Sequence, residues 1–170
     1  MHRIWAPWRA EYFLNEKPGG CIFCLLSSQR DASGQPSSDQ ANYVLVRDRT
    51  CFAILNAFPY SGGHLMVGPY RHTGELDDLT EDELKDLLVL ARRCKRAMGR
   101  AFNADGYNFG INLGAASGAG IPGHIHLHVV PRWNGDTNFM TVLSDTRVIS
   151  EGLAQTYEKL MEQFKAEGAK

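Results

Sequence analysis

The sequence predicts an α+β domain in which an antiparallel sheet packs against one long helix. Short apolar segments at 43–47, 51–56 and 64–69 follow one another through turns, with no helical pattern between them. A long amphipathic segment at 80–102 then has the period of a helix. Strands that cluster around one helix, with few βαβ crossovers, are typical of an antiparallel sheet.

Turn residues and a helix cap indicate where these elements begin and end. The break Pro-Tyr-Ser-Gly-Gly at 59–63 is typical of a hairpin-like turn between the second and third strands. Thr80 and Glu83 have the spacing of a capping box, so the helix is expected to begin there and to continue to about Phe102. Its apolar stripe is predicted at Leu84, Leu87, Leu88, Ala91 and Met98.

The second half of the chain continues the sheet and adds a final helix. A strand at 107–113 is followed by a glycine-rich loop at 114–123 and a strand at 124–130, which Pro131 is expected to end. The last helix is predicted to begin near Ser150 and to turn one apolar side inward. That side comprises Leu153, Tyr157, Leu160, Met161 and Phe164.

Composition indicates one soluble domain. The chain has 170 residues, of which 44% are hydrophobic, enough for a single core. A net charge of −1 argues against nucleic acid as a partner, and no apolar run approaches the length of a membrane span. We therefore predict a cytoplasmic protein that binds neither nucleic acid nor membrane. Residues 1–170 are expected to form one domain, with an aromatic N-terminal extension at 1–20 and a C-terminal extension at 134–170 that ends in a helix.

Three histidines occupy alternate positions in the segment Gly-His-Ile-His-Leu-His-Val-Val-Pro at 123–131. His124, His126 and His128 alternate with apolar residues, so their imidazoles are expected to share one face of a strand. Three interpretations are open: a solvated strand face, a metal site, or catalysis by a neutral imidazole that attacks phosphorus. The regularity of the run argues against the first.

The loop before these histidines contains four glycines. It is either a flexible connection or a nest of backbone N–H groups that can approach a phosphate closely. A nucleophile beside such donors is the arrangement that phosphoryl or nucleotidyl transfer requires. There is no Walker-type motif and no carboxylate cluster for two-metal chemistry, so the sequence favours histidine chemistry at a phosphate.

The remaining cysteines and histidines are harder to interpret. Cys21 and Cys24 form a Cys-x-x-Cys pair, which alone is a chance pair, a redox motif or half of a zinc site. Cys51 and Cys94 are expected to be buried small hydrophobes. His64 is expected to be a hydrogen-bonded structural histidine rather than a catalytic one.

The pattern His-φ-His-φ-His-φ-φ, with φ apolar, resembles the signature of the histidine triad (HIT) superfamily. The similarity covers roughly 21–133 and includes the segments at 55–56, 63–67 and 69–72. The segments Trp-Ala-Pro-Trp-Arg at 5–9 and Pro-Arg-Trp at 131–133 resemble the bacterial diadenosine tetraphosphate phosphorylase and fragile-histidine-triad-like group. This resemblance implies an HIT-like antiparallel sheet with one long helix, which pairs with a second copy into a homodimer.

The resemblance also implies a covalent mechanism. His126 would be the nucleophile that attacks the α-phosphorus of a nucleotide, and His128 would contact the phosphate and assist the leaving group. The implied substrate is a dinucleoside polyphosphate with adenine bases, and diadenosine tetraphosphate is the best single choice. The residues implied in substrate or phosphate binding are Asn56, Asn112, Ser117, Gly118, Ala119, Gly120 and Trp133.

A structural zinc ion is the second implication. Zinc-bearing histidine triad proteins and the related galactose-1-phosphate uridylyltransferases place ligands at the positions of His72 and His124. Together with Cys21 and Cys24, these would complete a tetrahedral Cys2His2 site without an open position for substrate. His124 would then have no catalytic role.

One position departs from the hydrolytic members of the superfamily. The fragile-histidine-triad type has a glutamine four residues before the first histidine, where this chain has Gly120. The missing amide opens room for inorganic phosphate as the acceptor, which favours phosphorolysis. Two alternatives stay open: a nucleoside phosphoramidate or mononucleotide-ester hydrolase of the same superfamily, and a nucleotide-binding interaction protein with weak catalysis.

Overall fold

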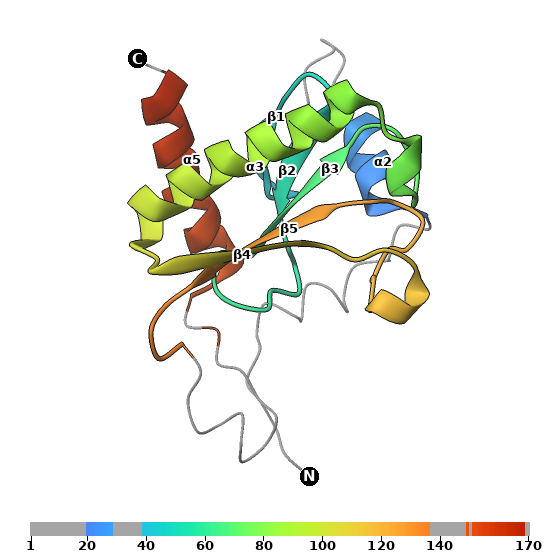
Figure 1. Cartoon of the computed structure of the whole chain (residues 1–170). Coiled ribbons are helices and arrows are strands. Elements are labelled where there is room, and N and C mark those ends of the chain that lie inside the picture. The colour runs from blue at the N-terminus through green and yellow to red at the C-terminus, as the bar shows by residue number, and fades with distance from the viewer. Residues whose placement is uncertain (1–19, 29–38, 137–148, 150, 169–170) are drawn as a thin grey trace.

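A five-stranded antiparallel sheet forms the centre of the computed structural model (Figure 1). The structure describes residues 20–28, 39–136, 149 and 151–168. The strand order is β1-β2-β3-β5-β4, and each neighbouring pair is antiparallel. The strands are β1 Val44–Arg47, β2 Cys51–Leu55, β3 Leu65–Pro69, β4 Gly106–Ile111 and β5 Leu127–Arg132. The predicted α+β class with an antiparallel sheet is therefore confirmed.

Helices cover both faces of this sheet. The long helix α3 (Glu81–Phe102) crosses one face, and α5 (Leu153–Gly168) packs beside it (Figure 1). A short helix, α2 (Ile22–Ser28), packs on the opposite face through a second, smaller core. Two 3-10 turns lie in the loops before α3 and after β4: η1 at Leu76–Asp78 and η2 at Ala115–Ser117.

Strand alternation explains why the sheet is buried on both sides. In β2, Cys51, Ala53 and Leu55 join the main core under α3, whereas Phe52 and Ile54 join the smaller core under α2. The same alternation in the histidine segment sends its apolar residues to the main core. The three imidazoles therefore share the opposite face, as predicted. All three are buried, so the interpretation as a solvated strand face is wrong.

The structure confirms the start of α3 and corrects its buried stripe. The Thr80 hydroxyl accepts a hydrogen bond from the Glu83 amide, and the Glu83 carboxylate accepts one from the Thr80 amide, which is the predicted capping box. Leu88, however, is 62% exposed. The inward stripe instead follows the helical period through Leu87, Leu90, Ala91, Cys94, Ala97 and Met98.

The last strand begins and ends later than predicted. β5 runs through Leu127–Arg132, so His124 and His126 precede it and Pro131 lies inside it. The ladder between β3 and β5 reaches only from Val67–Leu127 to Leu65–Val129. Pro131 therefore lies beyond the end of β3, where its missing N–H interrupts no bond to that neighbour.

The chain ends are described only in part. The aromatic extension predicted at 1–20 lies outside the described residues apart from residue 20. The predicted C-terminal helix is present as α5, which buries Tyr157, Leu160 and Phe164.

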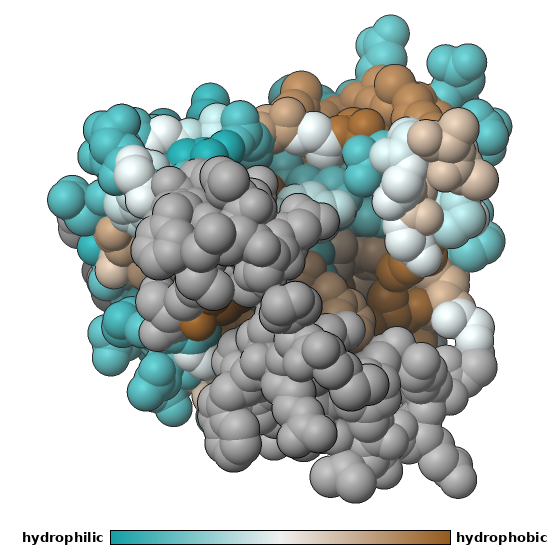
Figure 2. Space-filling view, turned by 90° about the horizontal axis from the view of Figure 1, so that it is seen from below, coloured by the Kyte–Doolittle hydropathy of each residue, from teal (hydrophilic) through white to brown (hydrophobic). Residues whose placement is uncertain are grey.

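A space-filling view from below shows apolar atoms of the described chain in a recess between more polar rims (Figure 2). Among the described helices, none is long and apolar enough to cross a membrane.

Candidate active site

His126 is held in the form that a nucleophile requires. Its Nδ1 lies 2.8 Å from the carbonyl oxygen of His124, which can only accept, so Nδ1 carries the proton and donates. The other ring nitrogen, Nε2, therefore keeps its lone pair. The side chain is 4% exposed, and burial lowers its pKa, which keeps the imidazole neutral near pH 7. A fixed tautomer with a free lone pair can attack an electrophile without first losing a proton.

The tautomer of His128 follows from a chain of hydrogen bonds that starts at the backbone. The Tyr60 amide donates to Nδ1 of His64 at 3.0 Å, so Nε2 of His64 carries the proton. That nitrogen lies 2.9 Å from Nδ1 of His128 and donates to it. The proton of His128 is therefore on Nε2, which lies 3.5 Å from the side-chain nitrogen of Asn112. Both of these nitrogens are donors, so Asn112 can accept a hydrogen bond from His128 only through its amide oxygen. His128 is thus a hydrogen-bond donor beside the lone pair of His126.

His64 is buried and hydrogen-bonded, as predicted, but its place beside His128 was not anticipated. Its ring centroid lies 5.0 Å from that of His128. Burial lowers the pKa of His64 to about 3 and that of His128 to about 4, and each imidazole disfavours charge on its neighbours. Both rings are neutral at pH 7.

These two pKa values predict a loss of stability in mild acid. The unfolded chain binds protons at the ordinary pKa of 6.5, whereas folded His64 and His128 stay neutral to about pH 4. The free energy of unfolding should therefore fall as pH decreases from 6.5 towards 4, by up to about 1.4 kcal/mol per pH unit for each histidine. Urea unfolding at a series of pH values measures this. His64→Asn should show a shallower slope than the parent, and equal slopes would contradict the assignment.

Phe23 is a site residue that the sequence analysis missed. Its ring stacks on His126, with centroids 5.2 Å apart, and on His124, with centroids 4.8 Å apart. The ring also lies so close to β3 that a Cβ on Gly68 would be 2.6 Å from it. Phe23 therefore fixes the planes of two histidines. Its place between the two cysteines was the available signal, since any site built on them carries Phe23 with it.

The predicted phosphate-binding residues fall into two groups. Asn112 lies beside His128, as described above. Ser117, Gly118, Ala119 and Gly120 lie in the loop that leads from β4 to the histidines, and all but Ala119 are exposed. Gly114 and Gly118 have φ values of +71° and +82°, so this turn requires glycine at both positions. The Ser117 hydroxyl donates to the Gly114 carbonyl, and no described hydrogen bond joins the loop to the histidine rings.

Asn56 and Trp133 take different positions relative to the histidines. The Asn56 amide nitrogen lies 3.3 Å from Nδ1 of His64, and its oxygen accepts from the Phe58 amide. Asn56 is therefore joined to His128 through His64. Trp133 follows β5, and its indole N–H donates to the carbonyl of Phe102 at the end of α3. The structure does not bring Trp133 to the cleft beside His128.

The four predicted metal ligands meet at one point. Cys21, Cys24, His72 and His124 place their ligand atoms within 4.8 Å of one another. The measured separations are 3.2 Å from Cys21 Sγ to His124 Nδ1, 3.1 Å from Cys24 Sγ to His72 Nδ1 and 3.3 Å between the two Nδ1 atoms. Zinc bonds in a tetrahedron give ligand separations of roughly 3.3 to 3.8 Å. The cluster therefore fits a tetrahedral Cys2His2 metal site.

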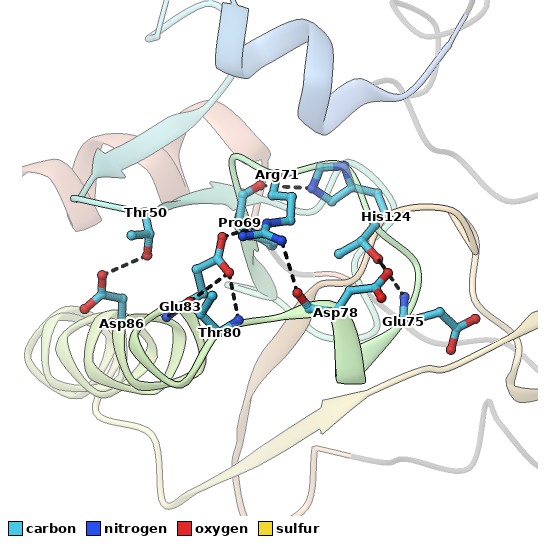
Figure 3. Close-up of polar contacts among 10 residues, drawn as sticks. Thr50, Pro69, Arg71, Glu75, Asp78, Thr80, Glu83, Asp86 and His124 are labelled. Atoms are coloured by element: carbon cyan, nitrogen blue, oxygen red, sulfur yellow. Dashed lines mark hydrogen bonds and ion pairs between the residues drawn. The ribbon is translucent and has the colours of Figure 1, made fainter.

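Surrounding contacts orient these ligands. The N–H at Nε2 of His124 donates to the Pro69 carbonyl at 2.9 Å, which leaves Nδ1 for a metal (Figure 3). The loop that carries His72 is fixed by Arg71, whose side chain donates to the Glu83 carboxylate and the Asp78 carbonyl (Figure 3). Cys21 immediately precedes α2 and Cys24 lies in its first turn, so this helix holds the two thiols.

A cleft of about 520 Å³ opens beside His128 on the α2 face of the sheet. The register pairs Gly110 with His128 and Asn108 with Val130, so these residues share one surface. Pro59 and Tyr60 form one wall. The cleft has the size of a small-molecule site and is lined by His128 itself.

The sequence is similar to a known protein family and to enzymes of other organisms. A family model described as the HIT domain matches residues 37–135. The chain is 35% identical to the AP-4-A phosphorylase of Mycobacterium tuberculosis (strain ATCC 25618 / H37Rv), over 96% of this chain and 85% of that protein. It is 36% identical to the asymmetrical bis(5'-nucleosyl)-tetraphosphatase of Schizosaccharomyces pombe, over 55% of this chain and 50% of that protein.

A solved structure agrees with the fold. The crystal structure of a zinc-bound histidine triad family protein from Mycobacterium smegmatis superimposes with a TM-score of 0.67 at 28% identity. The match covers 88% of this chain and 97% of that one. Because the HIT domain model spans more than half of the chain and includes the histidine segment, this protein belongs to the histidine triad family.

Proposed function

We propose that this HIT-family enzyme transfers a nucleotidyl group from a dinucleoside polyphosphate through a covalent bond to His126. The observation that carries the proposal is the hydrogen bond from Nδ1 of His126 to the His124 carbonyl, which leaves a neutral, buried Nε2 with a lone pair. The names of the relatives supply the substrate class, since they include an AP-4-A phosphorylase and a bis(5'-nucleosyl)-tetraphosphatase. Diadenosine tetraphosphate is the substrate that we propose first.

The first step is an in-line displacement at the α-phosphorus. Nε2 of His126 forms a bond to phosphorus while the bond from phosphorus to the bridging oxygen breaks, and the electron pair goes to the leaving ATP. The N–H at Nε2 of His128 donates to the phosphate and stabilises charge on the leaving oxygen. The His124 carbonyl stabilises the positive charge that develops on the His126 ring, because it accepts a hydrogen bond from the N–H at Nδ1 of that ring.

The second step releases the adenylyl group to an acceptor. An oxygen of inorganic phosphate attacks phosphorus, the bond to Nε2 breaks, and ADP is formed; with water as the acceptor, the product is AMP. We propose phosphate, because a Cβ built on Gly120 meets no heavy atom of the described residues within 4 Å. Asn112 and the 117–120 loop are the groups that we assign to the phosphate oxygens.

Product analysis tests this proposal. Diadenosine tetraphosphate is incubated with the protein, with and without inorganic phosphate, and the nucleotides are separated by ion-exchange chromatography. Phosphorolysis should give one ADP and one ATP per substrate, and only when phosphate is present. If both incubations give AMP and ATP, the reaction is hydrolysis and not phosphorolysis. No turnover of this substrate would contradict the proposed reaction, and turnover of adenosine 5'-phosphoramidate instead would favour the phosphoramidate hydrolase.

We propose Zn²⁺ as the ion at Cys21, Cys24, His72 and His124. The separations of the ligand atoms, the two thiols and the zinc-bound relative all support this choice. Four protein ligands leave no coordination position for substrate, so a bound ion joins α2 to the start of the histidine segment. The homodimer stays a prediction; β4 is an edge strand of the sheet, where a second copy could pair with it.

A further inference from the structure

The cleft beside His128 exists because β4 has a glycine directly opposite that histidine. Gly110 is the register partner of His128, and a Cβ built on it meets no heavy atom of the described residues within 4 Å. Gly110 has no φ value in the left-handed region, so the backbone does not require glycine there. A glycine within a strand weakens it and often marks a place where a ligand approaches closely.

The cleft continues away from the histidines along β5. Arg132 lies four residues beyond His128, which corresponds to about 13 Å along a strand. A hydrogen bond spans only about 3 Å, so a single phosphate at His128 leaves most of this length for other groups. The size and direction of the cleft therefore suit the part of a substrate that lies beyond the reacting phosphorus.

Arg132 provides hydrogen-bond donors at the far end of the cleft, where it forms an ion pair with Asp136. Its guanidinium donates to the Asp136 carboxylate through Nε and one terminal nitrogen, and to the Asn108 side chain through the other. Among the described residues, these contacts take three of its five N–H groups and leave two. The pair with Asp136 also fixes the orientation of the guanidinium, so its two remaining donors can meet a phosphate without further ordering.

We propose that this cleft is the leaving-group subsite, in which Gly110 makes room for a nucleoside polyphosphate and Arg132 binds its distal phosphates. The inference rests on the proposed nucleotidyl transfer. In that reaction the N–H at Nε2 of His128 donates a hydrogen bond to the leaving oxygen, so the leaving group lies on the side of His128. The adenylyl half that becomes attached to His126 lies outside the cleft. Gly110 thus selects dinucleoside polyphosphates over nucleotides with a small leaving group.

Equilibrium binding to a catalytically silent background tests the subsite. Gly110→Val is combined with His126→Ala, and isothermal titration calorimetry measures Kd for diadenosine tetraphosphate and for AMP. Valine suits a strand and fills the space beside His128, so binding of the dinucleotide should weaken by about 10- to 100-fold. Binding of AMP, which has no leaving half, should change by less than about 3-fold. Arg132→Gln in the same background should weaken the dinucleotide by about 10-fold and leave AMP unchanged.

The matched control is Ile111→Val in the same background. Ile111 follows Gly110 in the same strand, but its side chain packs against the main core on the opposite face of the sheet. It should alter neither Kd. If Gly110→Val weakens both ligands equally or neither, the subsite is wrong while the proposed function stands. If the His126→Ala protein itself binds neither ligand, the proposed function fails instead.

Discussion

Replacing His126 with alanine should lower kcat/KM for diadenosine tetraphosphate by at least about 10⁴-fold, because the covalent step loses its nucleophile. The neighbouring imidazole of His128 cannot act as the nucleophile instead. Its Nδ1 accepts a hydrogen bond from His64, and its Nε2 is protonated, so neither nitrogen has a free lone pair. The same substitution should abolish the transfer of radioactive phosphorus from α-labelled substrate to protein, quenched with alkaline detergent because a phosphorus–nitrogen bond to imidazole is stable in base and hydrolyses in acid. Initial rates and covalent labelling measure the two effects.

His64→Ala is the matched control for this experiment. It deletes another buried imidazole of the same cluster but leaves the nucleophile and its bond to the His124 carbonyl. This variant should still form the labelled intermediate, with a rate reduced by about 10- to 100-fold because His128 loses its orienting donor. A His126→Ala protein that is folded and still turns over substrate at the parent rate would eliminate the covalent mechanism.

Cys21→Ser should remove the metal ion and, with it, much of the stability of the active-site face. Structural metal sites contribute directly to folding, so the free energy of unfolding should fall by roughly 3 to 5 kcal/mol. Activity should fall as well, because the two cysteines flank Phe23, whose ring packs on His126. Elemental analysis of the purified protein, urea unfolding and initial rates measure the three effects.

Cys94→Ala separates metal loss from the loss of a buried thiol. Cys94 lies on the inward side of α3 in the main core, away from the metal cluster. Burial raises its pKa to about 12, so it is an un-ionised thiol. Its replacement should cost about 1 kcal/mol of stability and leave the metal content unchanged. Unchanged zinc in Cys21→Ser protein would contradict the ligand assignment.

Local patterns were sufficient to predict most of the fold. The capping box at Thr80, the alternation in the histidine segment and the apolar stripe of the last helix each depend on residues within two turns or one strand. These features are confirmed because burial acts on the same period that the sequence shows. One error has a local cause, because Leu88 is one position outside the inward stripe. The other has a long-range cause, because Pro131 is tolerated in β5 only where the neighbouring strand β3 has ended.

The geometry of the site depends on contacts between distant parts of the chain. The residue types at the metal cluster were predicted through resemblance, but their convergence requires α2, the loop after β3 and the histidine segment to pack together. The tautomer of His128 depends on a backbone amide at Tyr60, which no pattern in the histidine segment contains. The cleft depends on the register that pairs Gly110 with His128.

The amino-acid sequence by itself therefore determined the α+β class, the main elements, the shared face of the three histidines and, through resemblance, the histidine triad family. The tertiary structure alone decided which nitrogen of each imidazole is free, how Phe23 joins the metal cluster to His126, and where the sheet is open to a ligand. The physical reason is the separation in sequence between the residues that interact. Helix and strand periods arise between near neighbours, whereas hydrogen bonds, ring stacking and cross-strand register join residues whose separation in the chain carries no periodic signal.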